Sequence, residues 1–180
     1  STDAQNAPDA VVVPGTDDEV ARVLTYASEN AIAVVPFGGG TSVVGGLDPV
    51  RDRFDAVISL DLRRFDALSE LDTESGIAVL GAGLTGPRAE ELLGEQGYSL
   101  GHFPQSFLFA TIGGFAATRS SGQASAGYGR FEDMVQGLRV VTPPVPSTPD
   151  GRRRLQPDRI WASCSSVPKA LSALSLRFGC

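Results

Sequence analysis

Residues 31–42 read AIAVVPFGGGTS, an apolar run followed directly by three glycines and two hydroxyl residues. The β-branched and apolar side chains of Ala31–Pro36 predict a short buried strand. The glycines permit positive φ angles and let the backbone approach another group closely. Successive backbone N–H groups in such a loop can converge on an anion, and Thr41 and Ser42 add hydroxyl donors. This stretch predicts a strand that ends in an anion-binding loop.

We expect the ligand of this loop to be a phosphate or pyrophosphate. No Lys follows the glycines, so the loop is not a Walker A motif, and the spacing does not fit a Rossmann fingerprint either. A loop without a ligand is the alternative that these residues alone leave open.

The elements around this loop alternate between strands and helices. Thr16 and Glu19 have the spacing of a helix-capping box, and a helix from there to about Asn30 follows from its apolar spacing. A second helix is expected at 87–96, and further strands at 10–14, 56–60, 65–71, 76–80 and 134–142. This order predicts an α+β fold with two small subdomains rather than one long parallel sheet.

The composition excludes several classes of protein. The chain has 180 residues, a net charge of −6 and two cysteines. Acidity disfavours nucleic-acid binding, because neutralising phosphates requires clustered positive charge. No apolar run approaches the ~20 residues of a membrane span, and no signal segment is evident, so we expect a cytoplasmic location. The cysteine content is far below that of a disulfide scaffold.

A second glycine motif occurs at Gly81-Ala82-Gly83-Leu84-Thr85-Gly86, between an expected strand and an expected helix. This is the context of a dinucleotide fingerprint. The acid that would hold a ribose ~20 residues further on is missing, which favours a tight strand-to-helix turn. A Rossmann-type NAD(P) protein that uses Gly81, Gly83 and Gly86 remains the alternative.

The stretch 101–122 is dense in Gly, Ser and Thr but keeps Phe and Ile, which a flexible linker would not. Small residues allow close approach, and hydroxyl and amide groups direct hydrogen bonds. Those features suit a buried planar ring with a polar edge.

Five motifs, PFGGGTS, GHFPQSFLFATIGG, ATRSSG, YGRFEDMV and RVVTP, follow one another in the chain. In this order they resemble the FAD-binding domain of the vanillyl-alcohol oxidase / p-cresol methylhydroxylase superfamily. The sequence looks most like alkyl-dihydroxyacetone-phosphate synthase and bacterial FAD-linked oxidases. The resemblance implies a two-subdomain FAD-binding domain at 8–150, with subdomains at about 8–60 and 61–150. Such proteins also carry a C-terminal cap domain, which we expect to be missing here.

The resemblance also implies which residues contact FAD. The glycine loop would wrap the pyrophosphate, a second segment would meet the flavin, and a third would complete the contacts. These residues are Pro36, Phe37, Gly38, Gly39, Gly40, Thr41 and Ser42; Gln105, Ser106, Phe107, Leu108, Phe109, Ala110, Thr111 and Gly113; and Thr118, Arg119, Ser120 and Ser121. Gln105 stands where many synthases carry an acid. His102 is expected to be structural, and Arg119 either contacts phosphate or flavin or lies on the surface.

The last 30 residues differ from the rest. They hold five Arg and one Lys against one acid, whereas residues 1–150 hold nine Arg against 20 acids. The family should continue here into a Gly-Ser-Glu-Gly segment. If Arg159-Ile160-Trp161 is encoded CGG-ATC-TGG, a shifted frame reads Asp-Leu and continues through Gly-Ser-Glu-Gly. The hypothesis is a frameshift near Gly151 that makes 151–180 an aberrant tail; a real basic tail that binds a partner is the alternative.

The resemblance implies an FAD-linked oxidoreductase, or a synthase that exchanges an acyl for an alkyl group on a dihydroxyacetone phosphate ester. Its substrate would be a small molecule, and the full-length family member is a possible homodimer. Without the cap domain we expect this chain to bind FAD weakly, if at all, and not to turn over. A non-catalytic remnant is a further alternative.

Overall fold

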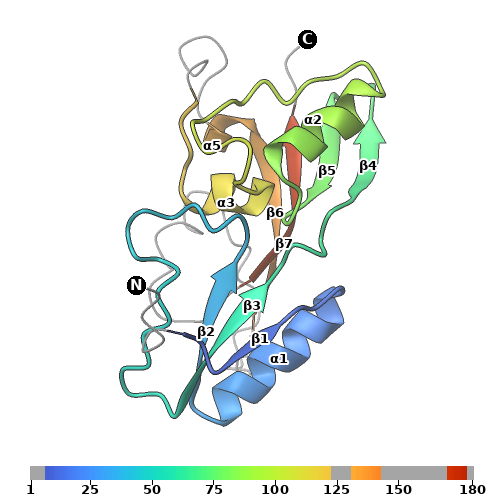
Figure 1. Ribbon diagram of the computed structural model, residues 1–180. Coiled ribbons are helices and arrows are strands. Elements are labelled where there is room, and N and C mark those ends of the chain that lie inside the picture. Colours follow the sequence, from blue (N-terminus) through green and yellow to red (C-terminus); the bar gives the residue numbers. More distant parts are fainter. Residues whose placement is uncertain (1–6, 123–130, 143–169, 178–180) are drawn as a thin grey trace.

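The chain forms two units, each built around its own β-sheet (Figure 1). The computed structural model describes residues 7–122, 131–142 and 170–177. In the described part of the chain, the first sheet has three strands and the second has four. None of the described helices is long and apolar enough to cross a bilayer.

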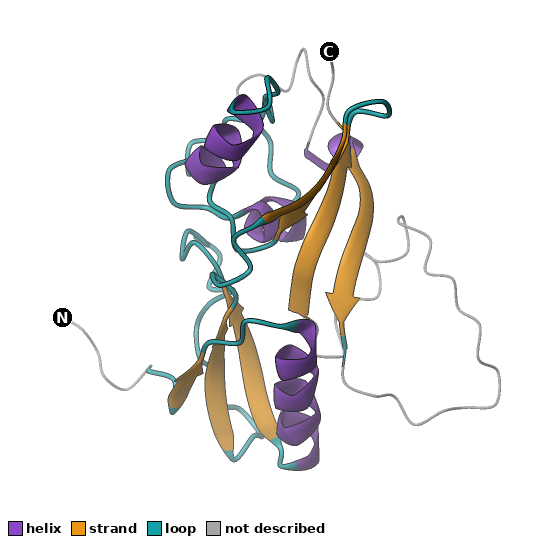
Figure 2. Cartoon of the chain, turned by 90° about the vertical axis from the view of Figure 1, so that its right-hand side faces the viewer, coloured by secondary structure: helices purple, strands orange, loops and turns teal. Residues whose placement is uncertain are grey.

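The first unit is a three-stranded parallel sheet with one helix against it. It contains β1 (Ala10–Val12), α1 (Asp17–Glu29), β2 (Ile32–Phe37) and β3 (Ala56–Asp61), with strand order β1-β3-β2. Figure 2 shows α1 along one side of these strands.

The predicted capping of α1 is confirmed. The Thr16 hydroxyl accepts a hydrogen bond from the Glu19 N–H at 3.2 Å, and the Glu19 carboxylate accepts one from the Gly15 N–H at 2.7 Å. The apolar face of the helix buries Val20 and Leu24 in a core that they share with Leu60. Burial of this face against the sheet, more than helix propensity, stabilises α1.

The second unit is an antiparallel sheet of strand order β4-β5-β7-β6. Its strands are β4 (Leu68–Asp72), β5 (Ile77–Gly81), β6 (Val135–Val141) and β7 (Ala170–Arg177). Helices α2 (Gly86–Gly94), α3 (Ile112–Ala117) and α5 (Phe131–Met134) belong to the same unit, as Figure 1 shows. Its core includes Leu80, Leu84, Leu93, Ile112 and Phe115, all at most 1% exposed.

Three elements were not predicted from the sequence: α3, α5 and β7, of which α5 includes Met134 at the start of the strand expected at 134–142. The 101–122 stretch contains the short helix α3, because Thr111 caps it and Ile112, Phe115 and Ala116 bury one face. Strand β7 was not predicted, and it pairs with both β5 and β6. Its place depends on partners far away in the sequence, which local patterns do not reveal. Of the tail expected to be aberrant, 151–169 and 178–180 lie outside the described residues.

The two units join where β3 ends. Leu62 N–H donates to the Phe37 carbonyl at 3.0 Å, still within the first unit. The chain then reaches the second unit, where Gly81 and Gly83 donate backbone hydrogen bonds to the carbonyls of Ala67 and Phe65, each at 2.9 Å. The connection between the sheets is therefore held by backbone hydrogen bonds on both sides.

Candidate functional site: two segments meet at the sheet junction

The glycine loop follows β2 at the carboxyl end of the parallel sheet, the edge at which ligands of parallel sheets commonly bind. A Cβ atom at Gly38 would lie 2.5 Å from the Thr111 hydroxyl oxygen. One at Gly39 would overlap the Phe109 carbonyl and lie 2.6 Å from the Ala110 Cα. Gly40 has φ of +69°, which side chains rarely adopt. Each glycine is thus required by its position.

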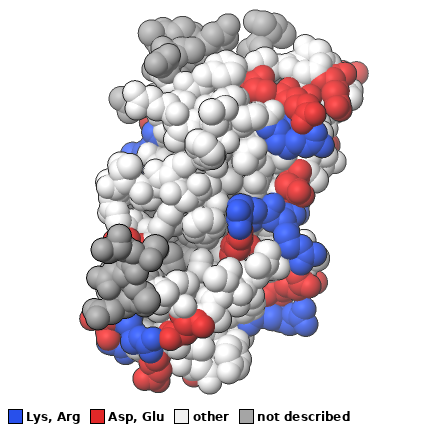
Figure 3. Space-filling model, in the orientation of Figure 1, with Lys and Arg blue, Asp and Glu red and all other residues white. Residues whose placement is uncertain are grey.

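The structure therefore brings together two segments that the sequence analysis assigned to one cofactor. Residues 38–39 lie directly on residues 109–111, although about 70 positions separate them. In the view of Figure 3, the described charged side chains gather mostly at the right and bottom, and the left centre, where the glycine loop lies, is largely uncharged.

The backbone of the glycine loop offers unused donors. Within the described residues, the N–H groups of residues 38–42 have no protein acceptor. The side chains of Thr41 and Ser42 are partly buried, as are Gly38 and Gly39. Consecutive backbone N–H groups in a glycine loop are suited to an anionic ligand.

The second segment, 104–111, is a pair of tight turns. Phe107 N–H donates to the Pro104 carbonyl at 3.0 Å, and Ala110 N–H donates to the Ser106 carbonyl at 2.8 Å. These turns leave Gln105 exposed, and expose Phe109 by 67%. Phe109 and the adjacent Leu108, which is 66% exposed, present apolar surface next to a donor-lined loop, and an exposed apolar patch is a feature of binding sites.

Phe107 differs from its neighbours. Its ring packs on Gly86 at the start of α2, where an added Cβ would lie 2.5 Å from two ring atoms. It also contacts Phe103, with ring centroids 5.0 Å apart. The structure therefore places Phe107 against α2, whereas Thr111 and the backbone of Phe109 and Ala110 face the glycine loop.

In the second motif, other parts of the chain occupy the space next to the glycines. An added Cβ at Gly81 would overlap the Phe65 carbonyl, and one at Gly83 would overlap the Leu62 carbonyl. The Gly86 N–H donates to the Ala110 carbonyl at 3.3 Å, where a Rossmann protein would place a phosphate. The motif is a packed strand-to-helix turn, which agrees with the missing ribose-binding acid.

Residues 118–121 and Gly113 serve largely local contacts. Gly113 N–H donates to the Ala82 carbonyl at 2.8 Å, so its close packing is against the 81–86 turn. The Thr118 hydroxyl donates to the Gly114 carbonyl at 2.9 Å. Arg119, with φ of +50°, lies 3.6 Å from the Glu132 carboxylate, and Ser121 is exposed.

His102 is buried, with 3% exposure, between the rings of Phe115 and Phe131, each 5.0 Å away. Its Nε2 lies 3.0 Å from the Ser120 hydroxyl oxygen. Burial lowers the pKa of His102 below its ordinary value of 6.5. The ring is therefore neutral at pH 7 and packs as a structural residue in this aromatic cluster.

Sequence reasoning missed one ion pair at this junction, between Asp61 and Arg63. Asp61 ends β3 and is 4% exposed, and Arg63 donates to both of its carboxylate oxygens. The Arg63 guanidinium lies over the Phe37 ring, 5.3 Å from its centroid. The sequence signal of this pair is an acid at the end of a buried strand with an arginine two residues later, a spacing that is also common on surfaces.

The chain matches the family described as FAD binding domain over residues 8–144. Alkyldihydroxyacetonephosphate synthase of Trypanosoma brucei brucei is 42% identical over 153 residues, which cover 80% of this chain and 25% of that protein. An uncharacterized FAD-linked oxidoreductase of Escherichia coli K12, YgcU, is 39% identical over 134 residues, or 74% of this chain and 27% of YgcU.

A solved structure of alkyldihydroxyacetonephosphate synthase superposes with a TM-score of 0.83 at 33% identity, covering 97% of this chain and 32% of the other. The chain thus spans about a quarter of the length of these curated relatives. The expected α+β fold of the p-cresol methylhydroxylase type is confirmed. The chain belongs to the FAD-binding domain family of FAD-linked oxidoreductases, which includes the alkyldihydroxyacetonephosphate synthases, and its cofactor is FAD.

Proposed function

We propose that the glycine loop binds the diphosphate of FAD and that residues 105–111 lie beside its flavin. The observation that carries this proposal is the contact of Gly38 and Gly39 with residues 109–111, next to five backbone N–H groups without a protein acceptor in the described chain. A diphosphate has the charge and the oxygens that such donors require.

The residues present fit this cofactor. The N–H groups of Gly38–Ser42 donate to diphosphate oxygens, and the hydroxyls of Thr41 and Ser42 extend the row of donors. The exposed Phe109 and Leu108 side chains supply apolar surface for a planar ring. Gln105, which is exposed at the first of the two turns, supplies amide hydrogen bonds at the polar edge of that ring. When bound, FAD supplies a ring that accepts and returns a pair of electrons.

The whole protein is proposed to act as an alkyldihydroxyacetonephosphate synthase-like enzyme, since the relatives so named reach 42% identity. A second candidate is an oxidase or dehydrogenase of a 2-hydroxy acid. A glycolate oxidase subunit of Bacillus subtilis that is 32% identical over 137 residues favours it.

The test of cofactor binding is a titration of FAD with the purified 180-residue chain, followed by quenching of flavin fluorescence. Saturable quenching supports the proposal. Unchanged fluorescence, together with a thermal midpoint that FAD does not raise, would contradict it, because a ligand of the folded state must stabilise it by mass action.

The two activities separate by their chemistry. Anaerobic 2-hydroxy acid would bleach the visible absorbance of a bound flavin in the dehydrogenase case, because two electrons move to the ring. In the synthase case, a fatty alcohol would release the fatty acid from an acylated dihydroxyacetone phosphate without net bleaching. If the FAD-loaded protein shows neither bleaching nor release of the fatty acid, a non-catalytic remnant is supported.

The tail remains a separate proposal: residues after about Gly151 are read out of frame, including the segment that forms β7 in the second sheet. The expected Gly-Ser-Glu-Gly segment in the shifted reading supports it, together with the reversal of charge after residue 150. Sequencing genomic DNA across codons 145–180 tests it. One added or missing base that opens the shifted frame confirms it, and genomic DNA that encodes residues 151–180 in the same frame as residues 1–150 excludes it.

A further inference from the structure

The ion pair Asp61–Arg63 is built into the junction next to the glycine loop. Asp61 accepts hydrogen bonds from the Arg63 backbone N–H at 3.0 Å, from Nε to both oxygens at 3.0 Å each, and from a terminal guanidinium nitrogen at 2.6 Å. The Asp61 side chain is 6% exposed and that of Arg63 60%. A buried carboxylate thereby fixes the position of a mostly exposed guanidinium.

The Arg63 guanidinium is linked to the glycine loop by the ring of Phe37, which contacts both. Arg63 lies over the Phe37 ring at 5.3 Å, a cation–π distance. The Phe37 ring also lies beside Gly40, where an added Cβ would lie 3.2 Å from the ring tip. Gly40 is the loop residue with positive φ. Contacts therefore run without a gap from Asp61 through Arg63 and Phe37 to the turn of the loop.

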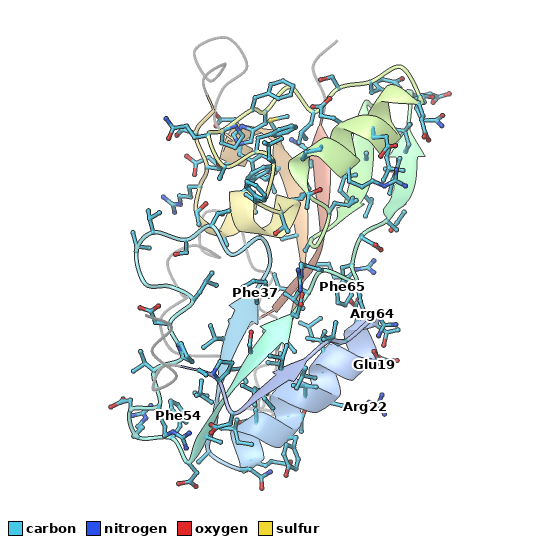
Figure 4. All side chains as sticks on the ribbon, viewed as in Figure 1. Glu19, Arg22, Phe37, Phe54, Arg64 and Phe65 are labelled. Carbon is cyan, nitrogen blue, oxygen red and sulfur yellow. The ribbon has the colours of Figure 1, made fainter. Side chains whose placement is uncertain are left out.

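The backbone reinforces this arrangement. Phe37 and Asp61 are partners in the parallel register of β2 and β3, and Leu62 N–H donates to the Phe37 carbonyl. Figure 4 shows Phe37 at the end of the first sheet that faces the second unit, whereas Phe54 lies at the opposite end.

Electrostatics keeps the pair charged. The hydrogen bonds from Arg63 hold the pKa of Asp61 below its ordinary value, although burial opposes this shift. The same hydrogen bonds raise the pKa of Arg63. Both groups are ionised at neutral pH, so the guanidinium remains available to the Phe37 ring.

We propose that Asp61 and Arg63 are positioning residues that hold the Phe37–Gly40 turn in its FAD-binding conformation. The inference rests on the proposed function of the loop and adds two residues that act on the loop through Phe37. The pair acts by preorganisation: a loop already held in its bound conformation does not lose that freedom on binding.

A second ion pair provides a matched control. Asp9 accepts hydrogen bonds from the Arg51 guanidinium and from the Val57 N–H at the opposite end of β3. It has the same chemistry, an aspartate that bridges an arginine and a backbone N–H. It contributes to the first sheet but has no contact with the glycine loop among the described residues.

The experiment compares Asp61→Asn with Asp9→Asn in two measurements, the thermal midpoint without FAD and the Kd for FAD by fluorescence quenching. We expect both variants to lower the midpoint, and only Asp61→Asn to raise the Kd, by about tenfold. Equal effects of the two variants on the Kd, or none, would overturn the inference.

Arg63→Lys tests the same inference if the Asp61→Asn variant fails to fold. It keeps the charge at an exposed position but loses the planar fork and the stacking on Phe37. We expect its midpoint to stay near that of the wild type while its Kd rises. A Kd equal to that of the wild type in Arg63→Lys would overturn this inference but leave the proposed function intact. Absence of FAD binding by the wild type would overturn both.

Discussion

The chain contains two glycine-rich turns that follow strands, and the structure gives them opposite roles. The turn at 81–86 is filled: backbone carbonyls of the 62–67 connection and the Phe107 ring lie where side chains would be. The turn at 38–42 is filled on one side only, by residues 109–111, and keeps a row of backbone donors without a protein acceptor among the described residues. A glycine motif indicates close approach, and only the neighbours decide whether a ligand or the protein comes close.

The largest effect is expected for Gly83→Ala. Its Cβ would overlap the Leu62 carbonyl and lie 2.7 Å from the Arg63 Cα, so the backbone between the two sheets must shift. We expect a loss of about 3 kcal/mol in the free energy of unfolding. Urea denaturation followed by circular dichroism measures it. Wild-type stability combined with lost NAD binding would instead favour the dinucleotide-fingerprint alternative.

Gly40→Ala tests the other turn. With φ of +69°, alanine here is strained by about 1 kcal/mol. Because the loop is at the surface, we expect the strain to change the loop conformation rather than unfold the chain, and to weaken FAD binding about tenfold. Fluorescence titration measures the Kd. Gly97→Ala, with φ of +81° and no atoms near its Cβ, is the matched control for strain, and it should leave the Kd unchanged.

A smaller effect is expected for His102. It precedes residues 107–111, which contact both glycine turns. Burial lowers its pKa in the folded chain, so between that value and 6.5 the unfolded chain binds more protons. The contribution of His102 to the free energy of unfolding should therefore be complete above pH 6.5 and decrease as the pH drops below 6.5. His102→Gln should remove this component of the pH dependence. Identical pH profiles for variant and wild type would contradict the buried, neutral histidine.

The smallest effect is a gain. Gly94 is exposed near the end of α2, and nothing lies within 4 Å of its Cβ position. Alanine there should stabilise the chain by about 0.5–1 kcal/mol, because glycine in a helix loses more conformational freedom on folding. A slightly higher thermal midpoint with an unchanged Kd for FAD is the expected result. A lower midpoint would show that this glycine, too, is held by its neighbours.

Local patterns predicted most of the first unit. Capping of α1 by Thr16 and the strand that ends at Phe37 both follow from residues close in sequence. The α3 helix was missed because its glycines and threonine are typical of loops, and the burial of Phe115 outweighs them. Strand β7 was missed because its pairing with β5 and β6 is set by distant residues.

The candidate site was predicted as three segments around one cofactor, but direct contacts between these segments were not predicted. The order of the motifs indicated the glycine loop and residues 105–111; that they touch emerges only from the contacts of Gly38 and Gly39. The Asp61–Arg63 pair escaped prediction because an acid and an arginine two positions apart are common on surfaces. Only burial of the carboxylate and the ring of Phe37 distinguish this pair.

The central claim is that the 38–42 turn binds a ligand and the 81–86 turn does not. Parallel titrations of the wild-type chain with FAD and NAD, each also performed on Gly40→Ala, test it most directly. The account predicts weak but saturable FAD binding that Gly40→Ala weakens further, and no binding of NAD. Saturable NAD binding that is indifferent to Gly40→Ala, with no response to FAD, would contradict it.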